Sequence, residues 1–481
     1  MELPLKETFK NGRTITEHVQ KNSASLAVLH DCRYRNGVVT EPPELFLGET
    51  TLLVGSKMFS TGGNFYAIGY NVTATAIQIL KLSTEEEVLA TETLFSDVVT
   101  TDGRMSFARF EKGVLFTRCE TGDMWWAPKE MDLTATPAVP PIYLGLVASF
   151  VGNFRERLVL ACLAPTAADA LSAALLADQM AAEVDQGDGY DGVIPADWTL
   201  LENPLRTVMW GGWLEDILNC LLNPTQENLT QLVRSHDWGW KKVPYTITGL
   251  HCMYNSIVLT SLRIVWRMTP LTEFPSFAFA PITNFGAMCS GSNAATTAFM
   301  AVDGRTYLLM DDGSLKQLSD RNDGEYGAAV VLSEQTGDIY WCGATGTLVY
   351  TTDSWYTRSE IVHAYAHRIG LDVMLGITHS FVPAITTEVM NLGTPLLKNI
   401  RSIRIIGTGV TGIRVHYTQD SQGLWGRTAT IIPDNTGTCL VGLSCMDLRL
   451  EIDCTNPVID DVIIDYDITP KANFGRISRR I

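Results

Sequence analysis

The sequence predicts a mainly β protein built around a β-propeller, because short strand-like runs follow one another with tight turns between them. The clearest stretch is residues 296–351, where Gly-containing turns and nothing helical separate the runs. Two of these turns carry Asp303-Gly304 and Asp312-Gly313, and Asp-Gly links match the twist of neighbouring strands. Strands that recur about every ten residues are typical of the meanders from which propeller blades are built.

Residues 1–49 are polar and predict an extended N-terminal arm. The arm ends in DCRYRNGVVTEPPEL, where the Asn36-Gly37 turn and the two adjacent prolines favour extended or turning backbone. Strand-like runs begin directly after it. We therefore assign residues 50–164 to the first part of the propeller.

The sequence pattern changes its period after residue 164. An Ala-rich stretch of helix formers, AADALSAALLADQMAAEV, follows Thr166, and the helix-like runs WLEDILNCLL and ENLTQLVRSH come later. Residues 165–244 are therefore predicted to form a helical insertion that interrupts the propeller. Such an insertion commonly serves assembly or partner contact, and the alternative is a cover over one side of the core.

Strand signals resume over residues 245–384, the predicted second part of the propeller. A different module follows over residues 385–481. In its run MDLRLEIDC, Leu448, Leu450 and Ile452 alternate with charged residues, which indicates a half-buried antiparallel sheet. We expect a C-terminal antiparallel β-sandwich-like module, with a basic tail, packed against the propeller.

Composition narrows the possible functions. The chain has 481 residues, 46% of them hydrophobic, and a formal net charge of -17. This charge argues against a surface that grips DNA or anionic lipid, although solubility alone also accounts for it. The sequence lacks the ~18 uninterrupted apolar residues of a membrane span, and its ten cysteines are predicted to be buried free thiols in a reducing cytosol.

Three glycines match the dinucleotide-binding pattern G-x-G-x-x-G. Gly407, Gly409 and Gly412 follow a strand-like run, and Asp434 comes later. That pattern binds a pyrophosphate only when a helix begins at the last glycine, so that its amides face the phosphates. Here the chain continues as the strand-like run IRVHYT. We therefore predict a hairpin or bulge and no cofactor.

The remaining motifs do not predict catalysis or a metal. His363 and His367 are four residues apart, but a zinc protease needs Glu where Ala364 stands, so packing or an interface is favoured. The run from Asp185 to Asp191 has the carboxylates for Ca²⁺ but no EF-hand register, so a solvated loop is favoured there. Because nucleophile elbows, P-loops and a sialidase-type turn are also missing, we predict no enzyme activity and no catalytic, cofactor-binding or metal-binding residues.

Two segments have features that a simple soluble propeller does not require. The run FPSFAFAP, residues 274–281, is aromatic, nearly uncharged and bounded by prolines, which suits an interface or, alternatively, a buried strand. The terminal run NFGRISRRI places arginines on an acidic chain, as a strap onto an acidic neighbour or as a solvated tail. The candidate interface residues are Phe274, Phe277, Phe279, Arg476, Arg479 and Arg480.

Taken together, these features resemble the tail nozzle or tail-hub proteins of short-tailed, podovirus-type bacteriophages. The resembling parts are DCRYRNGVVTEPPEL, the propeller runs, and the closing module from IRSIRIIGTGVTGIRVHYT to VIIDYDI with its terminal arginines. The resemblance covers most of the chain by architecture and little of it by identical motif.

The resemblance implies a structural virion protein that is assembled in the host cytoplasm. It implies a homo-oligomeric ring, a hexamer in this family, that extends the DNA channel below the portal and adaptor proteins. Such a ring supports genome ejection and holds tail fibres or a needle, while double-stranded DNA passes through its lumen without specific binding. The resemblance implies no catalysis.

Two other classes compete with this interpretation. One is a carbohydrate-active propeller enzyme of the glycoside hydrolase type. The other is a cellular interaction propeller, which is disfavoured because neither a WD nor a kelch repeat recurs in the sequence.

Overall fold

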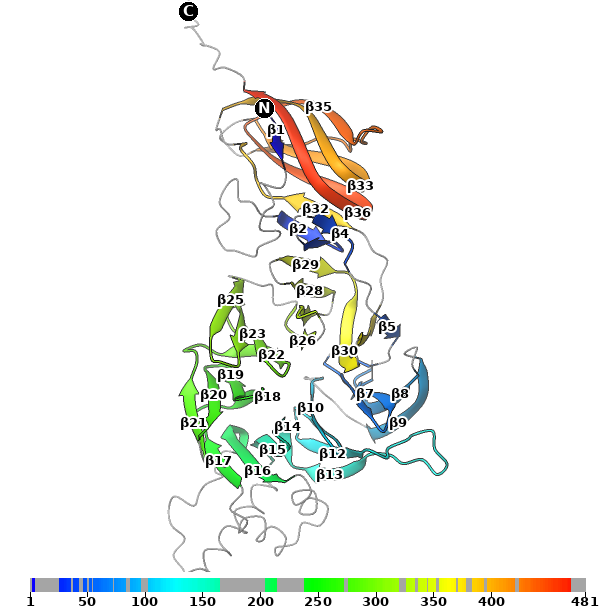
Figure 1. Cartoon of the computed structure of the whole chain (residues 1–481), viewed down its shortest axis with the longest axis vertical. Helices are drawn as coiled ribbons and strands as arrows, with labels where there is room; N and C mark the ends of the chain where they lie inside the picture. Colours follow the sequence, from blue (N-terminus) through cyan, green and yellow to red (C-terminus); the bar gives the residue numbers. More distant parts are fainter. Residues whose placement is uncertain are drawn as a thin grey trace, which may run out of the picture.

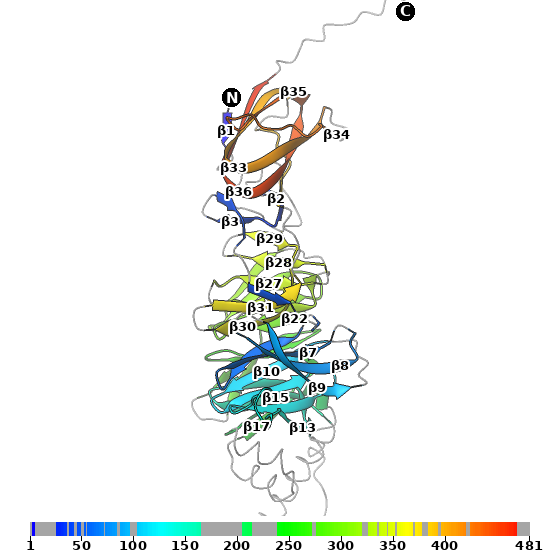
Figure 2. The ribbon, with the colours of Figure 1, turned by 90° about the vertical axis from the view of Figure 1, so that its right-hand side faces the viewer.

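The computed structural model describes an elongated molecule with a propeller at one end and a second β module at the other (Figure 1). A view turned by 90° shows the same order along the long axis (Figure 2). The described residues are 2–4, 26–35, 38–42, 46–49, 52–53, 55–71, 73–83, 87–96, 103–164, 204–213, 238–271, 276–319, 326–333, 336–343, 345–351, 354–368, 371–377, 383–392, 396–419 and 424–468.

Six four-stranded antiparallel blades form the propeller in this part of the chain, and each strand pairs with the next along the sequence. The first blade contains β6 (Lys57–Thr61), β7 (Asn64–Tyr70), β8 (Ala76–Leu82) and β9 (Val88–Ser96). The second contains β10 (Met105–Phe110), β11 (Gly113–Arg118), β12 (Asp123–Pro128) and β13 (Ile142–Leu146). The third contains β14 (Ala148–Phe154), β15 (Arg157–Leu163), β16 (Thr207–Trp213) and β17 (Trp238–Lys242).

The other three blades follow in sequence order. The fourth contains β18 (Ile247–Cys252), β19 (Ile257–Ser261), β20 (Val265–Pro270) and β21 (Phe277–Pro281). The fifth contains β22 (Ala287–Ser292), β23 (Thr296–Ala301), β24 (Thr306–Met310) and β25 (Leu315–Ser319). The sixth contains β26 (Ala329–Leu332), β27 (Ile339–Cys342), β28 (Thr347–Tyr350) and β29 (Trp355–Arg358).

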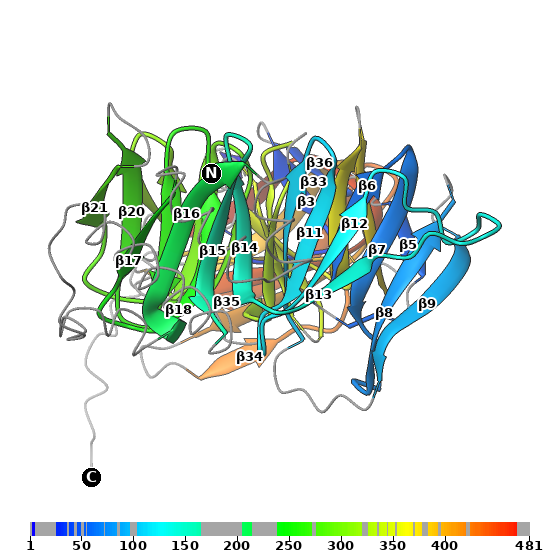
Figure 3. The same cartoon turned by 90° about the horizontal axis from the view of Figure 1, so that it is seen from below.

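A three-stranded sheet lies between the sixth and first blades. It consists of β30 (Ile361–Arg368), β31 (Leu371–Ile377) and β5 (Phe46–Glu49), with β5 parallel to β31. Because β30 contacts both β27 and β6, this sheet completes the ring of blades. Figure 3, which looks along the long axis, shows strands of the first four blades standing side by side.

The turns within residues 296–351 confirm the predicted meander. Gly304 has a φ of 86°, and the carboxylate of Asp303 accepts the backbone N–H of Arg305 at 3.1 Å. Gly313 has a φ of 92°, a conformation that a residue without a Cβ adopts without steric cost. Each turn reverses the chain over two or three residues, which spaces the strands as the sequence predicts.

Apolar side chains pack between neighbouring blades and form most of the core. Phe59 of the first blade stacks on Phe116 of the second, with ring centroids 6.0 Å apart, and Phe116 stacks on Trp125 at 5.6 Å. All three side chains are buried. Aromatic pairs of this kind bury a large apolar area and fix the position of one blade against the next.

Two unusually long antiparallel strands dominate the C-terminal module. They are β33 (Lys398–Thr418) and β36 (Asp447–Ile468). One edge of β33 pairs with β34 (Trp425–Arg427) and β35 (Thr438–Cys445), and the outer edge of β36 pairs with β1 (Glu2–Pro4), β4 (Val38–Thr40) and β32 (Ala384–Thr387).

The alternation predicted for β36 is confirmed. Leu448, Leu450 and Ile452 are buried in one cluster that also contains Ile403 and Ile464, from the other halves of the two long strands. The two halves of this bent sheet therefore share a core. The finer description as a sandwich stays a prediction.

The glycine cluster lies at a bend of β33, as the sequence predicts. The pairing of β33 with β36 shifts register at Gly407 and on both sides of Val410. Gly409 has a φ of 83°, and a Cβ there would lie 2.3 Å from the carbonyl oxygen of Thr455. These glycines accommodate β-bulges that let a single strand bend, with no helix after them.

The N-terminal segment differs from the predicted arm. Its described residues form strands: β2 (Leu26–His30) pairs in parallel with β29 and antiparallel with β32, and β3 (Arg33–Arg35) pairs with β4. The sixth blade and the C-terminal module therefore belong to one continuous sheet. The sequence did not indicate this, because β2 pairs with strands far away in the chain and has no local hairpin signal.

The range predicted as a helical insertion also contains strands. Within residues 165–244, the described parts are a short 3-10 helix (Pro204–Arg206), β16 and β17, and these two strands form the outer half of the third blade. Aromatic and β-branched residues such as Val208 and Trp210 suit a strand. The predicted helices themselves lie outside the described residues.

Two further expectations concern membranes and cysteines. No helix in the described ranges is long and apolar enough to span a bilayer. None of the nine cysteines in these ranges forms a disulfide, and all but Cys252 are buried.

Candidate functional site

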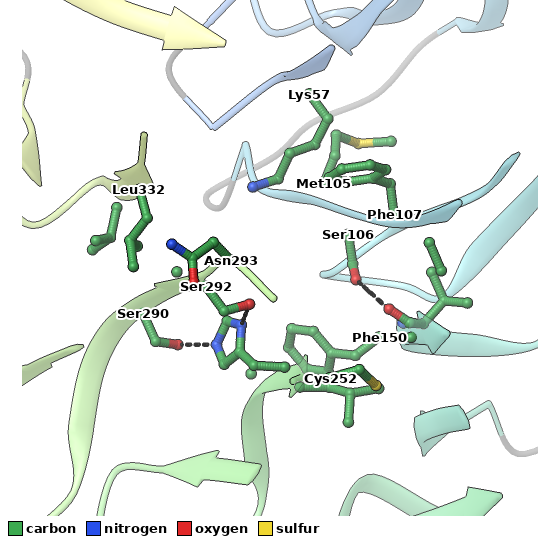
Figure 4. Close-up of a pocket in the computed structure, with 18 of the residues that line it drawn as sticks. Lys57, Met105, Ser106, Phe107, Phe150, Cys252, Ser290, Ser292, Asn293 and Leu332 are labelled. Atoms are coloured by element: carbon green, nitrogen blue, oxygen red, sulfur yellow. Dashed lines mark hydrogen bonds between the residues drawn. The ribbon is translucent and has the colours of Figure 1, made fainter. Parts of the chain in front are cut away.

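A central cavity of about 650 Å³ lies where the innermost strands of the blades face one another. Its walls come from β6, β10, β14, β18, β22 and β26. Both polar and apolar side chains line the cavity, as Figure 4 shows for the labelled residues. Cavities of this size typically hold small-molecule ligands.

Glycines set the close approach of the strands around the cavity. A Cβ on Gly152 in β14 would lie 2.5 Å from Sγ of Cys252 in β18. A Cβ on Gly291 in β22 would lie 2.1 Å from the carbonyl oxygen of Val330 in β26. Since neither position has room for a side chain, the walls of the cavity are closely packed.

His251 in β18 lies between two serines of β22. Its Nδ1 is 3.1 Å from Oγ of Ser292, and its Nε2 is 2.7 Å from Oγ of Ser290 (Figure 4). Burial, together with the charge of Lys57, lowers the pKa of His251 to about 3. The imidazole is therefore neutral at pH 7, with one ring nitrogen as donor and the other as acceptor.

The contact between Ser290 and His251 has the components of a nucleophilic pair. An imidazole with a pKa near 3 is a weak general base at neutral pH. In addition, Ser292 occupies the Nδ1 side, where a catalytic triad has a carboxylate. This geometry gives little support to acyl transfer.

The cavity carries positive charge on one side. Lys57 extends from β6 into the cavity (Figure 4), and Arg104 lies just before β10. Burial lowers the pKa of Lys57, and the charge of Arg104 lowers it further. Arg109 and Arg155 also line the cavity, while the described lining includes a single carboxylate, Glu156.

The interface phenylalanines predicted from the sequence lie elsewhere. Phe277 and Phe279 belong to the outer strand β21, and the Phe277 ring packs on Trp210 and Phe154 at centroid distances of 5.3 and 5.7 Å. Both phenylalanines are half-buried. The segment is therefore a strand, as the alternative prediction has it, but these two side chains are only partly covered. Their contact with a partner stays a prediction.

The other predicted candidates are not described. Phe274, Arg476, Arg479 and Arg480 lie outside the described residues, as does the run from Asp185 to Asp191. The backbone of His363 and His367 belongs to strand β30. In the described part of the chain, no group of three or more His, Cys, Asp or Glu side chains could hold a metal.

A second candidate site is an apolar edge on the C-terminal module. The segment that pairs along one edge of β33 exposes Leu424, Ile432 and Leu440 to 75%, 77% and 81% of their surface, respectively. Trp425, next to Leu424, is also exposed. We call these four residues the module edge. Large apolar side chains at such high exposure are typical of contact surfaces.

Sequence reasoning missed both sites. The cavity residues Lys57 and His251 come from separate blades and share no local motif. The module edge follows loops and short strands, where single apolar residues are common. One signal in the sequence could have pointed to the cavity: a polar residue, such as His251, in an otherwise apolar strand.

Comparisons with known proteins concern the fold alone. No protein-family model matches the chain, and no curated protein matches it. Among solved structures, the Swd1 β-propeller domain from Myceliophteria thermophila is 9% identical, with a TM-score of 0.33 over 60% of this chain and 94% of that chain. A quinonprotein alcohol dehydrogenase-like protein from Bacteroides thetaiotaomicron is 10% identical, with a TM-score of 0.35 over 63% of this chain and 65% of that chain.

The computationally designed Ika8 protein is similar to the same degree. It is 10% identical, with a TM-score of 0.33 over 70% of this chain and 97% of that chain. Similarities at these scores carry no argument about function. The six-blade arrangement rests on the strand pairing of the chain itself.

Proposed function

We propose that this protein is a structural subunit of the tail of a short-tailed bacteriophage, in the position of a nozzle or hub. Copies of the chain form a ring that extends the DNA channel, supports genome ejection and provides attachment for fibres or a needle. Its partners are further copies of itself and the portal or adaptor proteins, and its location is the virion.

The module edge is the observation that carries this proposal. Leu424, Ile432 and Leu440 expose at least three quarters of their surface to solvent, and hydrating such side chains costs about 1.5–3 kcal/mol each relative to burial. Contact with a neighbouring subunit would remove this cost. An assembled protein therefore accounts for these residues better than a monomeric enzyme does.

The strand pairing at the module edge supports the same conclusion. Among the described residues, β34 and β35 pair with β33 on one side alone, so their outer backbone groups are available to another chain. Exposed strand edges of this kind are templates for pairing between subunits.

A ring also requires a second, different contact surface on each subunit. The propeller exposes Leu89 and Phe95 on β9, and Ile142 and Leu146 on β13. These strands are the outer strands of the first and second blades, so they lie on a different module from the module edge. The chain thus exposes large apolar side chains on two different modules, and a closed ring of identical subunits needs two different contact regions.

Charge is compatible with a DNA channel. Six copies at -17 each would carry a formal charge of -102. Carboxylates that line a lumen repel the phosphates of DNA, so the genome passes without binding to the wall.

The enzyme alternative receives less support from the cavity. A glycoside hydrolase uses a pair of carboxylates that flank the scissile bond, whereas the described lining of the cavity includes Glu156 alone.

Electron microscopy and particle labelling test the proposal. We expect the purified full-length chain to form closed rings at micromolar concentration, and antibodies against it to label the tail end of short-tailed particles from its source. A chain that stays monomeric at high concentration, and that is missing from purified particles by mass spectrometry, would overturn the proposal.

A further inference from the structure

We propose that the central cavity of the propeller binds a small multivalent anion, a phosphorylated or polycarboxylate metabolite, with Lys57 and Arg104 as its charged partners. This binding site is independent of the tail role, because it lies inside one subunit and not in the lumen of a ring.

The charge of the cavity opposes that of the chain. The whole protein carries a formal charge of -17, yet the described cavity lining holds four cationic side chains, Lys57, Arg104, Arg109 and Arg155, against one carboxylate, Glu156. Concave walls of low dielectric concentrate such a field and raise the local concentration of ions of the opposite sign. The field selects an anion.

Among the described residues, no carboxylate acts on Lys57, although a half-buried ammonium group normally has such a partner. The groups that act on its pKa include the thiols of Cys119 and Cys342 and the guanidinium of Arg104, with no carboxylate among the described residues. Burial of an ammonium without a counter-charge costs free energy. A bound anion would offset this cost and would favour the charged form of Lys57.

Arg104 supplies a second positive charge in reach of the first. It acts on Lys57 and also on Cys289, on the β22 side of the cavity. Two cations that repel each other in one cavity are stabilised together by a ligand that carries more than one negative charge. This relation favours a multivalent anion over a monovalent one.

Neutral donors complete the site. Asn293 uses Oδ1 to accept the backbone amides of Ala295 and Thr296, at 2.9 and 2.8 Å. Its amide N–H₂ group is therefore directed away from that turn and is a donor toward the cavity (Figure 4). The hydroxyls of Ser290 and Ser292 also line the cavity, where each contacts a ring nitrogen of His251. Ammonium, guanidinium, amide and hydroxyl donors are the groups that recognise phosphate and carboxylate oxygens.

The size of the cavity limits the ligand. A volume of about 650 Å³ holds a molecule of up to nucleotide size and excludes a folded partner or duplex DNA. The glycine-packed walls at Gly152 and Gly291 leave little room to widen it.

Isothermal titration calorimetry on the full-length protein at low salt tests this proposal, with pyrophosphate, citrate and ATP as probes and maltose as a neutral control. We expect saturable binding of one equivalent of pyrophosphate or citrate, and no binding of maltose. Pyrophosphate and citrate together show whether phosphate or carboxylate is preferred.

Substitutions locate the binding. Lys57→Met and Arg104→Met should each weaken binding by at least about tenfold, because each removes one charge without adding a polar group. Lys242→Met is the matched control, since Lys242 is an exposed lysine on the outer strand β17 that does not line the cavity. Circular dichroism and thermal melts confirm the fold of each variant.

Two results would overturn the proposal. One is the lack of saturable binding for all three anions at millimolar concentration. The other is binding that Lys57→Met and Arg104→Met change no more than Lys242→Met does. If a cavity variant fails to fold, a measurement on the wild-type protein takes its place. Pyrophosphate should then slow the reaction of Cys252 with a thiol reagent, because Cys252 lines the same cavity.

Discussion

Asp31 and Ser359 share two hydrogen bonds although 328 residues separate them in the sequence. The backbone amide of Ser359 donates to Oδ1 of Asp31 at 2.8 Å, and its hydroxyl donates to Oδ2 at 2.5 Å. Asp31 is completely buried and has a φ of 46°. The pair attaches the end of β2 to the end of β29, where the sixth blade meets the C-terminal module.

Loss of this attachment should destabilise the protein. We expect Asp31→Ala to lower the free energy of unfolding by about 2–4 kcal/mol, because it removes both acceptors of the half-buried Ser359 amide and hydroxyl and places alanine at a positive φ. Asp31→Asn, which tolerates that φ and keeps one acceptor, should cost less. Urea denaturation followed by circular dichroism measures both. A loss no larger than that of the exposed control Asp303→Ala would contradict this role.

The bend of β33 should depend on glycine at position 409. In Gly409→Ala the new Cβ would lie 2.3 Å from the oxygen of Thr455 and 2.5 Å from that of Asn456, at a φ of 83°. We expect a loss of about 3 kcal/mol. Gly442→Ala is the control, since Gly442 has a φ of 59° with open space around it, and should cost about 1 kcal/mol. Equal denaturation midpoints for the two variants would refute the argument.

The C-terminal module should lose stability in acid. Burial raises the pKa of Glu451, but hydrogen bonds from Arg414 at 2.6 Å and His416 at 2.8 Å outweigh burial and lower that pKa to about 2. Because the folded value lies below the unfolded value of 4.5, the stabilisation is present above pH 4.5 and is lost as the pH falls toward 2.

Glu451→Gln tests this pH dependence. The variant should lose on the order of 2 kcal/mol at pH 7 and show a flatter decline of stability below pH 4.5 than the wild type. Thermal melts across this pH range provide the measurement, with the exposed Glu92→Gln as the control. A decline in the Glu451 variant as steep as that of the wild type would exclude this carboxylate as a cause.

The module edge should govern assembly without contributing to the fold. We expect Leu440→Asn combined with Ile432→Asn to weaken self-association by at least about tenfold, while the melting temperature of the subunit stays within about 2 °C. Leu262→Asn, at an exposed turn of the fourth blade, is the matched control. Mass photometry that finds the same ring population in both variants would count against the module edge as an interface.

Thiol chemistry should be slow in the folded protein. Burial raises the pKa of the Cys162, Cys289 and Cys342 thiols to about 12, so these groups stay protonated at pH 8. Since the thiolate is the reactive form, iodoacetamide should modify them far more slowly in buffer than in urea. Peptide mass spectrometry assigns each site, and modification at equal rates in both conditions would be inconsistent with burial.

Much of the fold is readable from neighbours in the sequence. Asp303-Gly304 marks a tight turn because its backbone preference is local, and the alternation of Leu448, Leu450 and Ile452 marks a half-buried strand because successive side chains point to opposite faces. Gly407 and Gly409 indicate bulges for the same kind of reason. These properties need no knowledge of the partner strand.

The tertiary structure decided what depends on distant partners. The strand β2 pairs with β29 and β32, and β5 pairs with β31, and no local pattern indicates such pairings. The cavity likewise exists because closing the ring brings Lys57 and His251 toward a common space. The sequence shows that these residues are present, but it does not show that they lie close together. Contacts across hundreds of residues cost chain entropy, and they form only when the folding of the whole chain compensates for that cost.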